Sequence, residues 1–268
     1  MARSPRTIDL SGQLLFLGTG TSVGVPVIGC DCATCSSTDV RNQRTRCAVV
    51  LGLPQGHLLI DTPPDLRWQL LREGVGIVHA VLYTHAHADH LYGLDDLRMF
   101  SYYLNKRVPL CCEDWVEARI RQAFDYACAA DEEPFHPGGI PLVEFRRIDT
   151  APFELLGARV VPIRLGHGKG CVLGFRVGNV AYCTDTNHIP PESWPLLEGL
   201  DVLILDALRD RPHPTHFSLP EAIEVARKLA PRRTLFTHIG HELEHGSAMA
   251  RLPAGMELAY DGLRVPLS

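Results

Sequence analysis

The run THAHADH at residues 84–90 limits what this chain can fold into more than any other part of the sequence. It follows the apolar run 78–83, which is typical of a buried strand. His85 and His87 are two residues apart, so in an extended segment both rings point to the same side. If a helix begins next, the following Asp-His pair projects from its first turn towards a second ion. A strand that ends in so many ligand groups predicts a metal site rather than a surface loop.

The overall composition is that of an ordinary globular protein. The chain has 268 residues, of which 46% are hydrophobic and 21% charged, and we predict a single domain over residues 1–268. The formal charge of −5 gives no general attraction for nucleic acid, which is therefore not an expected partner. Residues 1–6 precede no apolar leader, and no window approaches the roughly eighteen apolar residues of a membrane span. We expect a cytoplasmic protein without a membrane partner.

The nine cysteines are an odd number, and three of them, Cys30, Cys32 and Cys35, lie close together. This distribution favours reduced thiols and one metal-binding knot over a disulfide framework. Three thiols spaced C-x-C-x-x-C are one ligand short of a tetrahedral structural zinc site. His241, three residues beyond His238, is a candidate for the fourth ligand. A redox-active thiol cluster is the alternative.

Short apolar runs with strand character alternate with helical segments. The strand-like runs are 13–17, 48–51, 57–60, 78–83, 159–163, 172–177, 180–183, 202–205 and 234–237. The helical segments are 64–73, 114–129 and 219–229, the last with Ser218 as its N-cap and Pro220 at its start. This alternation predicts an α/β (α+β) fold in which helices cover sheets. Residues 130–141, rich in Pro, Gly and acids, are expected to form a surface loop.

Metal-ligating residue types recur directly after these apolar runs. The positions are Asp61, His85, His167, Asp185, Asp206 and His238. Side chains that converge from the ends of several strands build a site on a rigid scaffold. Taken singly, His167, Asp185 or His238 is equally well explained as a hydrogen-bonded core residue, and Asp61 as a turn residue. The joint pattern therefore carries the prediction.

The combined set resembles the metallo-β-lactamase superfamily, whose HxHxDH motif is matched in full by residues 85–90. The resemblance implies a four-layer αββα sandwich that holds two divalent ions, Zn, Mn or Fe, at the edge of its sheets. It implies that Asp185 bridges both ions and that Asp61 orients a metal-bound histidine. The other implied ligands are His85, His87 and His167 for one ion, and Asp89, His90 and His238 for the second.

Further motifs resemble one branch of that superfamily, the phosphoribosyl 1,2-cyclic phosphate phosphodiesterases of bacterial phosphonate breakdown and their relatives. The motifs are Gly-Thr-Gly at 18–20, Gly-Val-Pro at 24–26, the cysteine knot at 30–35 and His-Ile-x-His at 238–241. The match runs from about residue 14 to residue 261. It implies one structural zinc held by the three thiols and His241, and a homodimer. Relatives with the run GLDDLR, here at 93–98, form a broad group whose substrates the motifs do not separate.

The resemblance implies hydrolysis of a small phosphodiester. Cyclic phosphodiesters such as phosphoribosyl 1,2-cyclic phosphate are among the candidate substrates. A hydroxide between the two ions would attack phosphorus, with Asp89 and Asp185 holding the ions. His216 corresponds to the branch's general-acid histidine, and an imidazole with a pKa near neutrality can protonate a departing oxygen. His213 is a competing candidate for that role.

Two other functions share parts of this pattern. A tRNA 3′-processing nuclease has the same metal motif, but such enzymes usually carry an extended arm for tRNA, and the sequence has no long basic insertion. A metal-bound metabolite carrier without hydrolysis is the other alternative. The run HELEH at 241–245 does not predict a zinc peptidase, because glycines on both sides interrupt the helix that such a motif needs.

Overall fold

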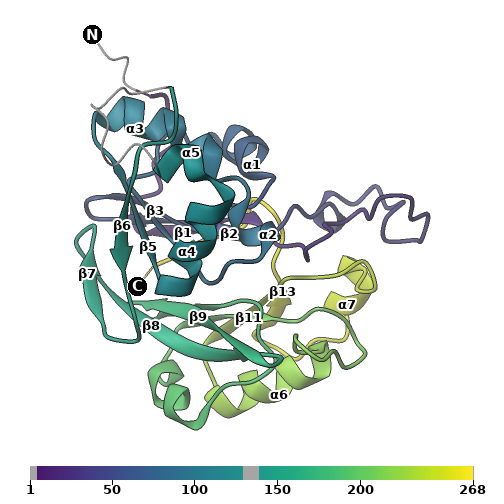
Figure 1. Cartoon of the computed structure of the whole chain (residues 1–268). Helices are drawn as coiled ribbons and strands as arrows, with labels where there is room; N and C mark the ends of the chain where they lie inside the picture. Colours follow the sequence, from purple (N-terminus) through teal and green to yellow (C-terminus); the bar gives the residue numbers. More distant parts are fainter. Residues whose placement is uncertain (1–4, 129–138, 268) are drawn as a thin grey trace.

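The computed structural model describes residues 5–128 and 139–267, and two β-sheets face each other at its centre (Figure 1). The strands of the first sheet are β1 Gln13–Gly18, β2 Ala48–Leu53, β3 Gly56–Ile60, β4 Ala80–Leu82, β5 Val108–Cys112, β6 Val143–Arg147 and β14 Arg264–Pro266. They lie in the order β14-β1-β2-β3-β4-β5-β6. The pairs from β3 to β6 are parallel, and the others are antiparallel.

The second sheet repeats this arrangement. Its strands are β7 Phe153–Leu155, β8 Ala158–His167, β9 Gly170–Val177, β10 Val180–Cys183, β11 Val202–Asp206, β12 Arg233–Thr237 and β13 Met256–Leu258. They lie in the order β13-β12-β11-β10-β9-β8-β7. The pairs from β10 to β13 are parallel, and β7 to β10 are antiparallel.

Helices cover the outer faces of both sheets. The α-helices are α1 Leu66–Glu73, α2 Ala88–Leu91, α3 Arg98–Leu104, α4 Asp114–Ala123, α5 Asp125–Cys128, α6 Leu219–Leu229 and α7 His245–Met249. Short 3-10 helices span Val40–Asn42, Leu94–Leu97 and Pro191–Leu197. No helix within residues 5–128 and 139–267 combines the length and the apolar composition needed to cross a bilayer.

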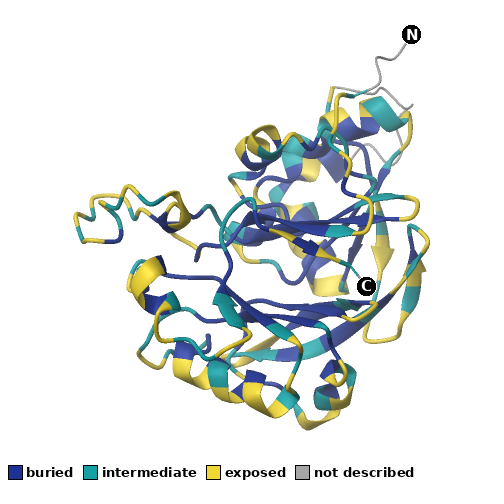
Figure 2. Ribbon diagram, turned by 180° about the vertical axis from the view of Figure 1, so that it is seen from behind, coloured by how far each residue is buried: buried dark blue, intermediate teal, exposed yellow. Residues whose placement is uncertain are grey.

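The alternation of side chains along the strands explains the layers. In β1, Leu15 and Leu17 pack under α1 to α5, whereas Leu14 and Phe16 point to the other face and meet the second sheet. The outer face of the second sheet, including Phe236, packs against α6. Buried strands between exposed helix faces are visible in Figure 2. These three apolar interfaces make the αββα sandwich, and the fold predicted from the sequence is confirmed.

Most of the predicted elements are present, with different ends. Helix α6 spans the predicted residues 219–229, and the Ser218 side chain accepts a hydrogen bond from the backbone N–H of Glu221. The predicted helix 114–129 is wrong as a single element, because Phe124 leaves the helical conformation between α4 and α5. The predicted strand 78–83 is shorter, since β4 covers three residues. Most of the predicted loop 130–141 lies outside the described residues.

The long connection between β1 and β2 projects from the sandwich (Figure 1). Where it returns to the body, the buried Arg44 donates hydrogen bonds to Thr19 Oγ1 at 2.9 Å and to the carbonyl of Ala259 at 2.6 Å. Its Nη2 also donates to Nδ1 of His245 at 3.0 Å. Since Nδ1 accepts this hydrogen bond, the contact requires a His245 ring that carries no proton on that atom.

These contacts predict a pH-dependent stability. Burial, and then the charge of Arg44, lowers the pKa of His245 from 6.5 to about 4. Between these values the unfolded chain binds the proton and the folded chain does not, so the free energy of unfolding falls as pH drops from about 6.5 towards 4. The loss from this group is at most about 3 kcal/mol.

Urea unfolding of the wild type and of His245→Gln between pH 7 and pH 4.5 measures this contribution. The glutamine oxygen can still accept from Arg44 but does not titrate, so the variant should lose less stability on acidification than the wild type. His57→Gln, at the far end of β3, is the control and should leave the wild-type slope unchanged. Parallel pH curves for wild type and His245→Gln would contradict the assignment.

Candidate metal centre

The candidate centre begins where the chain passes from β4 to α2. Helix α2 starts directly after His87, which is in an extended conformation with φ −67° and ψ 153°. The condition that a helix begins after the two spaced histidines is therefore met. His85 and His87 precede the helix, and Asp89 and His90 lie in it. The change from strand to helix turns the two pairs of side chains to different positions.

The structure gathers these side chains, with three from the second sheet, into two groups that share one carboxylate. The first group is His85, His87, His167 and Asp185, and the second is Asp89, His90, Asp185 and His238. Within each group the candidate ligand atoms lie within 4.8 Å of one another. This is the division that the family resemblance implies. His87 is exposed, so the first group is accessible from solvent.

Buried nitrogen atoms without hydrogen-bond partners test whether these residues fit metal ions. Among the described residues, Nε2 of His85, His90 and His238 has no hydrogen-bond partner. These atoms lie 3.8, 3.2 and 3.4 Å from carboxylate oxygens of Asp185, whose side chain is 2% exposed. An unpaired buried polar atom is costly, and cations between these atoms would satisfy the imidazoles and the carboxylate together. The donor set therefore fits two ions of the Zn, Mn or Fe type.

The charges within the centre depend on one another. Burial alone would raise the pKa of Asp185, but the imidazoles of His238 and His90 hold it well below its usual range. Burial would lower the pKa of His90, whereas the carboxylates of Asp185 and Asp61 hold it well above its usual range. Burial, then the neighbouring His90, lowers the pKa of His85. Metal binding must displace protons from such imidazoles, so acid opposes metal binding.

Neighbouring groups fix the orientation of the rings. His90 donates from Nδ1 to Asp61 Oδ2 at 2.7 Å, and Asp61 also accepts from the backbone and hydroxyl of Thr84. His167 donates from Nδ1 to the carbonyl of Thr215 at 2.9 Å. Both contacts direct Nε2 of the ring into the centre. The predicted role of Asp61 in orienting a histidine agrees with this geometry.

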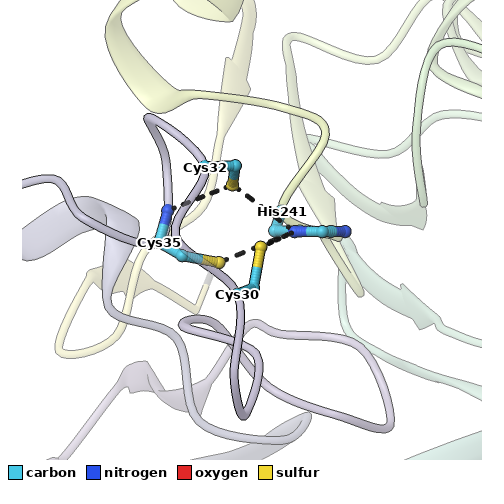
Figure 3. A group of neighbouring side chains, drawn as sticks. All are labelled: Cys30, Cys32, Cys35 and His241. Carbon is cyan, nitrogen blue, oxygen red and sulfur yellow. Dashed lines mark hydrogen bonds between the residues drawn. The ribbon is translucent and has the colours of Figure 1, made fainter.

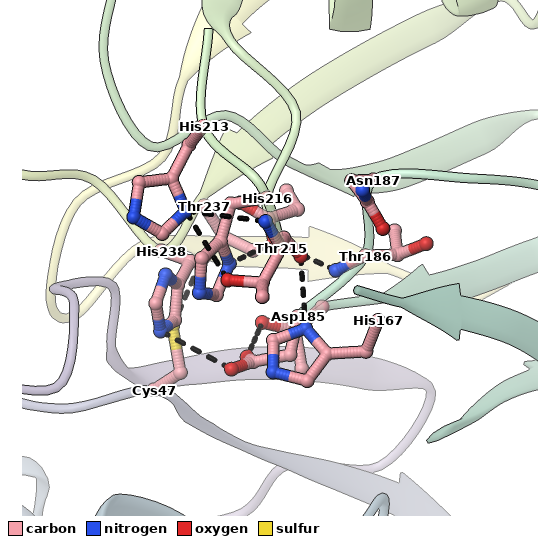
Figure 4. A network of polar contacts seen from close by, with 12 residues as sticks. Cys47, His167, Asp185, Thr186, Asn187, His213, Thr215, His216, Thr237 and His238 are labelled. Atoms are coloured by element: carbon pink, nitrogen blue, oxygen red, sulfur yellow. Dashed lines mark hydrogen bonds and ion pairs between the residues drawn. The ribbon is translucent and has the colours of Figure 1, made fainter. Parts of the chain in front are cut away.

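Asp206 has a role that the sequence does not assign, although its type and its place beside a strand are those of the ligand residues. His216 donates from Nδ1 to Asp206 Oδ2 at 2.7 Å, and the backbone N–H of Thr186 donates to the same oxygen. Figure 4 shows His216 and Thr186 near Asp185. The ring of His216 stacks on His238 with centroids 4.4 Å apart. Asp206 therefore holds the His216 imidazole against the metal-ligand groups.

His213, the competing candidate for the general acid, lies on the far side of His216 from the metal-ligand groups. Its ring centroid is 5.2 Å from that of His216, and its Nδ1 accepts from the Thr215 backbone N–H at 3.4 Å. No carboxylate holds a ring nitrogen of His213 in the described residues, in contrast to His216. The geometry therefore favours His216 as the proton-carrying residue.

The cysteine knot and His241 form a group of their own, apart from the two catalytic ligand groups (Figure 3). The Sγ atoms of Cys30, Cys32 and Cys35 lie 3.3, 3.5 and 3.6 Å from Nδ1 of His241. A tetrahedral zinc with ordinary Zn–S and Zn–N bonds separates such ligand atoms by about 3.6 Å. These side chains could therefore hold a structural zinc, and His241 lies where the sequence suggested a fourth ligand.

The comparison with known proteins agrees with the fold and the motifs. Residues 57–239 match the family model described as "Beta-lactamase superfamily domain". The chain belongs to the metallo-β-lactamase superfamily. It resembles the crystal structure of a diphosphatase from the PhnP family, with 43% sequence identity and a TM-score of 0.87. That match covers 94% of this chain and 96% of the other, so the PhnP-like branch is also confirmed.

Two more distant matches place this similarity in a wider group. The Zn²⁺-bound PqqB of Methylobacterium extorquens shares the fold at 19% identity and a TM-score of 0.79, over 95% of this chain and all of the other. A protein named octanoyltransferase from Porphyromonas gingivalis is 33% identical over 255 residues, which are 94% of this chain and 51% of that protein. This chain thus spans about half the length of that relative.

The hydrogen bond between Asp61 and His90 predicts an effect on metal binding. Asp61→Asn removes the carboxylate that orients His90, so ions at the second group should bind roughly 10- to 100-fold more weakly. Competition with a chromogenic chelator measures this affinity. Asp65→Asn, which alters a carboxylate paired with Arg46 outside both ligand groups, is the control and should bind ions like the wild type. Wild-type affinity in Asp61→Asn would refute the orienting role.

Proposed function

We propose that this chain is a metal-dependent hydrolase that acts at the phosphorus of a small phosphodiester. The observation that carries the proposal is the pair of ligand groups sharing Asp185, with the Asp206-held His216 facing the same space. The similar structure of a PhnP-family diphosphatase supports chemistry at phosphorus. A diphosphate linkage and a phosphodiester both present a phosphoryl centre with an oxygen leaving group. A small cyclic phosphodiester such as phosphoribosyl 1,2-cyclic phosphate remains the predicted substrate.

The two ions, when bound, would activate a water molecule and neutralise negative charge on the phosphoryl oxygens. The protein's contribution is a rigid frame for them. Asp185 is 3.8, 3.2 and 3.4 Å from His85, His90 and His238, so one carboxylate links both ligand groups and fixes their separation. The exposed edge at His87 leaves an approach for a small substrate.

His216 is placed to carry a proton to the leaving group. Its Nδ1 donates to Asp206, which fixes the orientation of the ring. Its Nε2 is therefore the atom that can donate to a departing oxygen. The stacking of His216 on His238 keeps this atom beside the second ligand group. We propose His216 as the general acid and Asp206 as its positioning residue.

Substitution of the shared carboxylate tests the proposed function. Asp185→Asn should lose catalytic ions and lower the hydrolysis of bis(p-nitrophenyl) phosphate by roughly a thousandfold or more, because both ligand groups lose their common charge. Initial rates and metal analysis of the same sample measure both effects. Asp210→Asn, at an exposed ion pair with Arg251, should match the wild type. An Asp185→Asn protein with native turnover would rule out the mechanism.

The role of His216 predicts a dependence on the leaving group. His216→Ala should lower kcat/KM roughly 100-fold for diesters with poor, basic leaving groups, and less for p-nitrophenyl esters, which depart without a proton. His213→Ala should show no such trend, since His213 lies on the far side of His216 from the metal-ligand groups. A loss in His216→Ala that is equal for all leaving groups would reassign His216 to binding of the phosphoryl group.

The other predictions from the sequence fit this proposal. The projecting connection is not a basic arm, since its Arg41 and the neighbouring Arg46 pair with Asp39 and Asp65. This pairing favours a small substrate over tRNA. Zn, Mn or Fe at the catalytic groups and Zn at the knot, a homodimer and a cytoplasmic location stay predictions. Metal analysis and light scattering of the purified protein would test the first two.

A further inference from the structure

The segment that follows β12 carries residues of both metal-binding groups. His238 belongs to the second catalytic group, and His241 belongs to the cysteine knot. Two residues separate them, Ile239 and Gly240. Any displacement of His241, the knot ligand, would therefore reach His238, the catalytic ligand, through only two residues of backbone.

The conformation of His238 must be imposed by its surroundings. Its φ is 58°, in the left-handed region that residues other than glycine rarely adopt. Within the described residues, neither of its ring nitrogens has a hydrogen-bond partner, so no such bond holds the ring. Besides its stacking on His216, the neighbouring backbone therefore maintains this strained residue in the orientation that directs Nε2 towards Asp89 and Asp185.

Backbone hydrogen bonds hold the two intervening residues from both sides. The N–H of Ile239 donates to the carbonyl of Thr19 at 2.9 Å, and the N–H of Thr21 donates to the carbonyl of Ile239 at 3.2 Å. The N–H of Gly240 donates to the carbonyl of Leu208 at 2.9 Å. Thr19 and Thr21 begin the projecting connection that carries the three knot cysteines. This connection thus meets the His238 segment twice, at Ile239 through hydrogen bonds and at His241 through the knot.

The projecting connection has little apolar packing to hold it in place. Ile28 is 97% exposed and Val40 is 73% exposed. A small loop without a core depends on a bound metal for its order, because the binding free energy of a structural zinc contributes directly to folding. Asn42 also connects this loop to the C-terminal part of the chain, because its side chain donates a hydrogen bond to Glu244 at 2.8 Å and accepts one from the backbone N–H of His245. Without the knot ion, this part of the connection would be held by hydrogen bonds, among them those of Asn42 and of Arg44.

We infer that the knot formed by the three thiols and His241 is a positioning device for His238, so that an ion at the knot is required for tight metal binding at the second catalytic group. His241 is thus a positioning residue rather than a catalytic one. The first catalytic group, His85, His87 and His167 with Asp185, contains no residue of this segment and keeps its affinity. The inference rests on the metal centre of the proposed function but not on the nature of the substrate.

The test compares His241→Ala with His241→Cys. The alanine variant loses the knot ion, whereas cysteine restores a four-ligand zinc site. Metal-free proteins are titrated with Zn²⁺ in competition with a chromogenic chelator. The equivalent of Zn²⁺ that His238→Ala fails to bind tightly is the one that belongs to the second catalytic group. In His241→Ala that same equivalent should weaken roughly tenfold or more, and His241→Cys should restore it. Ile28→Ser, on the same connection, should bind like the wild type.

A His241→Ala protein that loses the knot ion but binds both catalytic ions with wild-type affinity would overturn the inference. If His241→Ala does not fold, the same question is answered in the folded metal-loaded protein with Cys171→Ser, which removes the exposed thiol. An organomercurial then displaces the knot ion, and the transfer of catalytic ions to the chelator is timed. Release of one catalytic ion should be at least about tenfold faster than without the reagent, and an unchanged rate would overturn the inference. No phosphodiester is used, so failure of the proposed function would not affect the result.

Discussion

The rest of the structure depends on the buried carboxylate of Asp185 and the imidazoles that surround it. A carboxylate with 2% exposure and three imidazole nitrogens without hydrogen-bond partners is an expensive arrangement in a protein interior. It becomes favourable when cations lie between these groups, because each ion neutralises the carboxylate and accepts the nitrogen lone pairs at once. His85 and His90 come from the first sheet's edge and His238 from the second. The two sheets must therefore meet with these edges aligned, and the apolar interface between them supplies that alignment.

The strand ends bear the conformational cost of this arrangement. Asp61, Asp185 and His238 have φ values of 65°, 55° and 58°. Each lies one or two residues after the end of a strand. A left-handed residue at that point turns the chain sharply and directs its side chain across the edge of the sheet. Such strain persists where the surrounding structure determines it strongly. Each of these strands, β3, β10 and β12, has at least one parallel neighbour in its sheet, so its end cannot relax without disrupting that pairing.

The sequence predicted the parts of the fold whose signal is local. Helix α6 has an amphipathic pattern and a capping box, and both are properties of adjacent residues. The edge strands β13 and β14 have three residues each, too few to show an alternating pattern, and neither was predicted. Strand β6, Val-Glu-Phe-Arg-Arg, is exposed at most positions and is defined by its pairing with β5. Its extended conformation comes from that long-range contact, which no local pattern records.

The same distinction separates the predicted and the missed parts of the site. Residues 85–90 carry their ligand pattern in one short run, although the helix that begins within it was only a condition of the sequence analysis. Asp206 is different, because an aspartate after a strand is common at turns and its meaning depends on what it contacts. Its partner His216 is ten residues away, and both are brought together by the connection between β11 and α6. A residue whose function is to hold another side chain leaves no motif of its own, so only the folded arrangement of both residues identifies it.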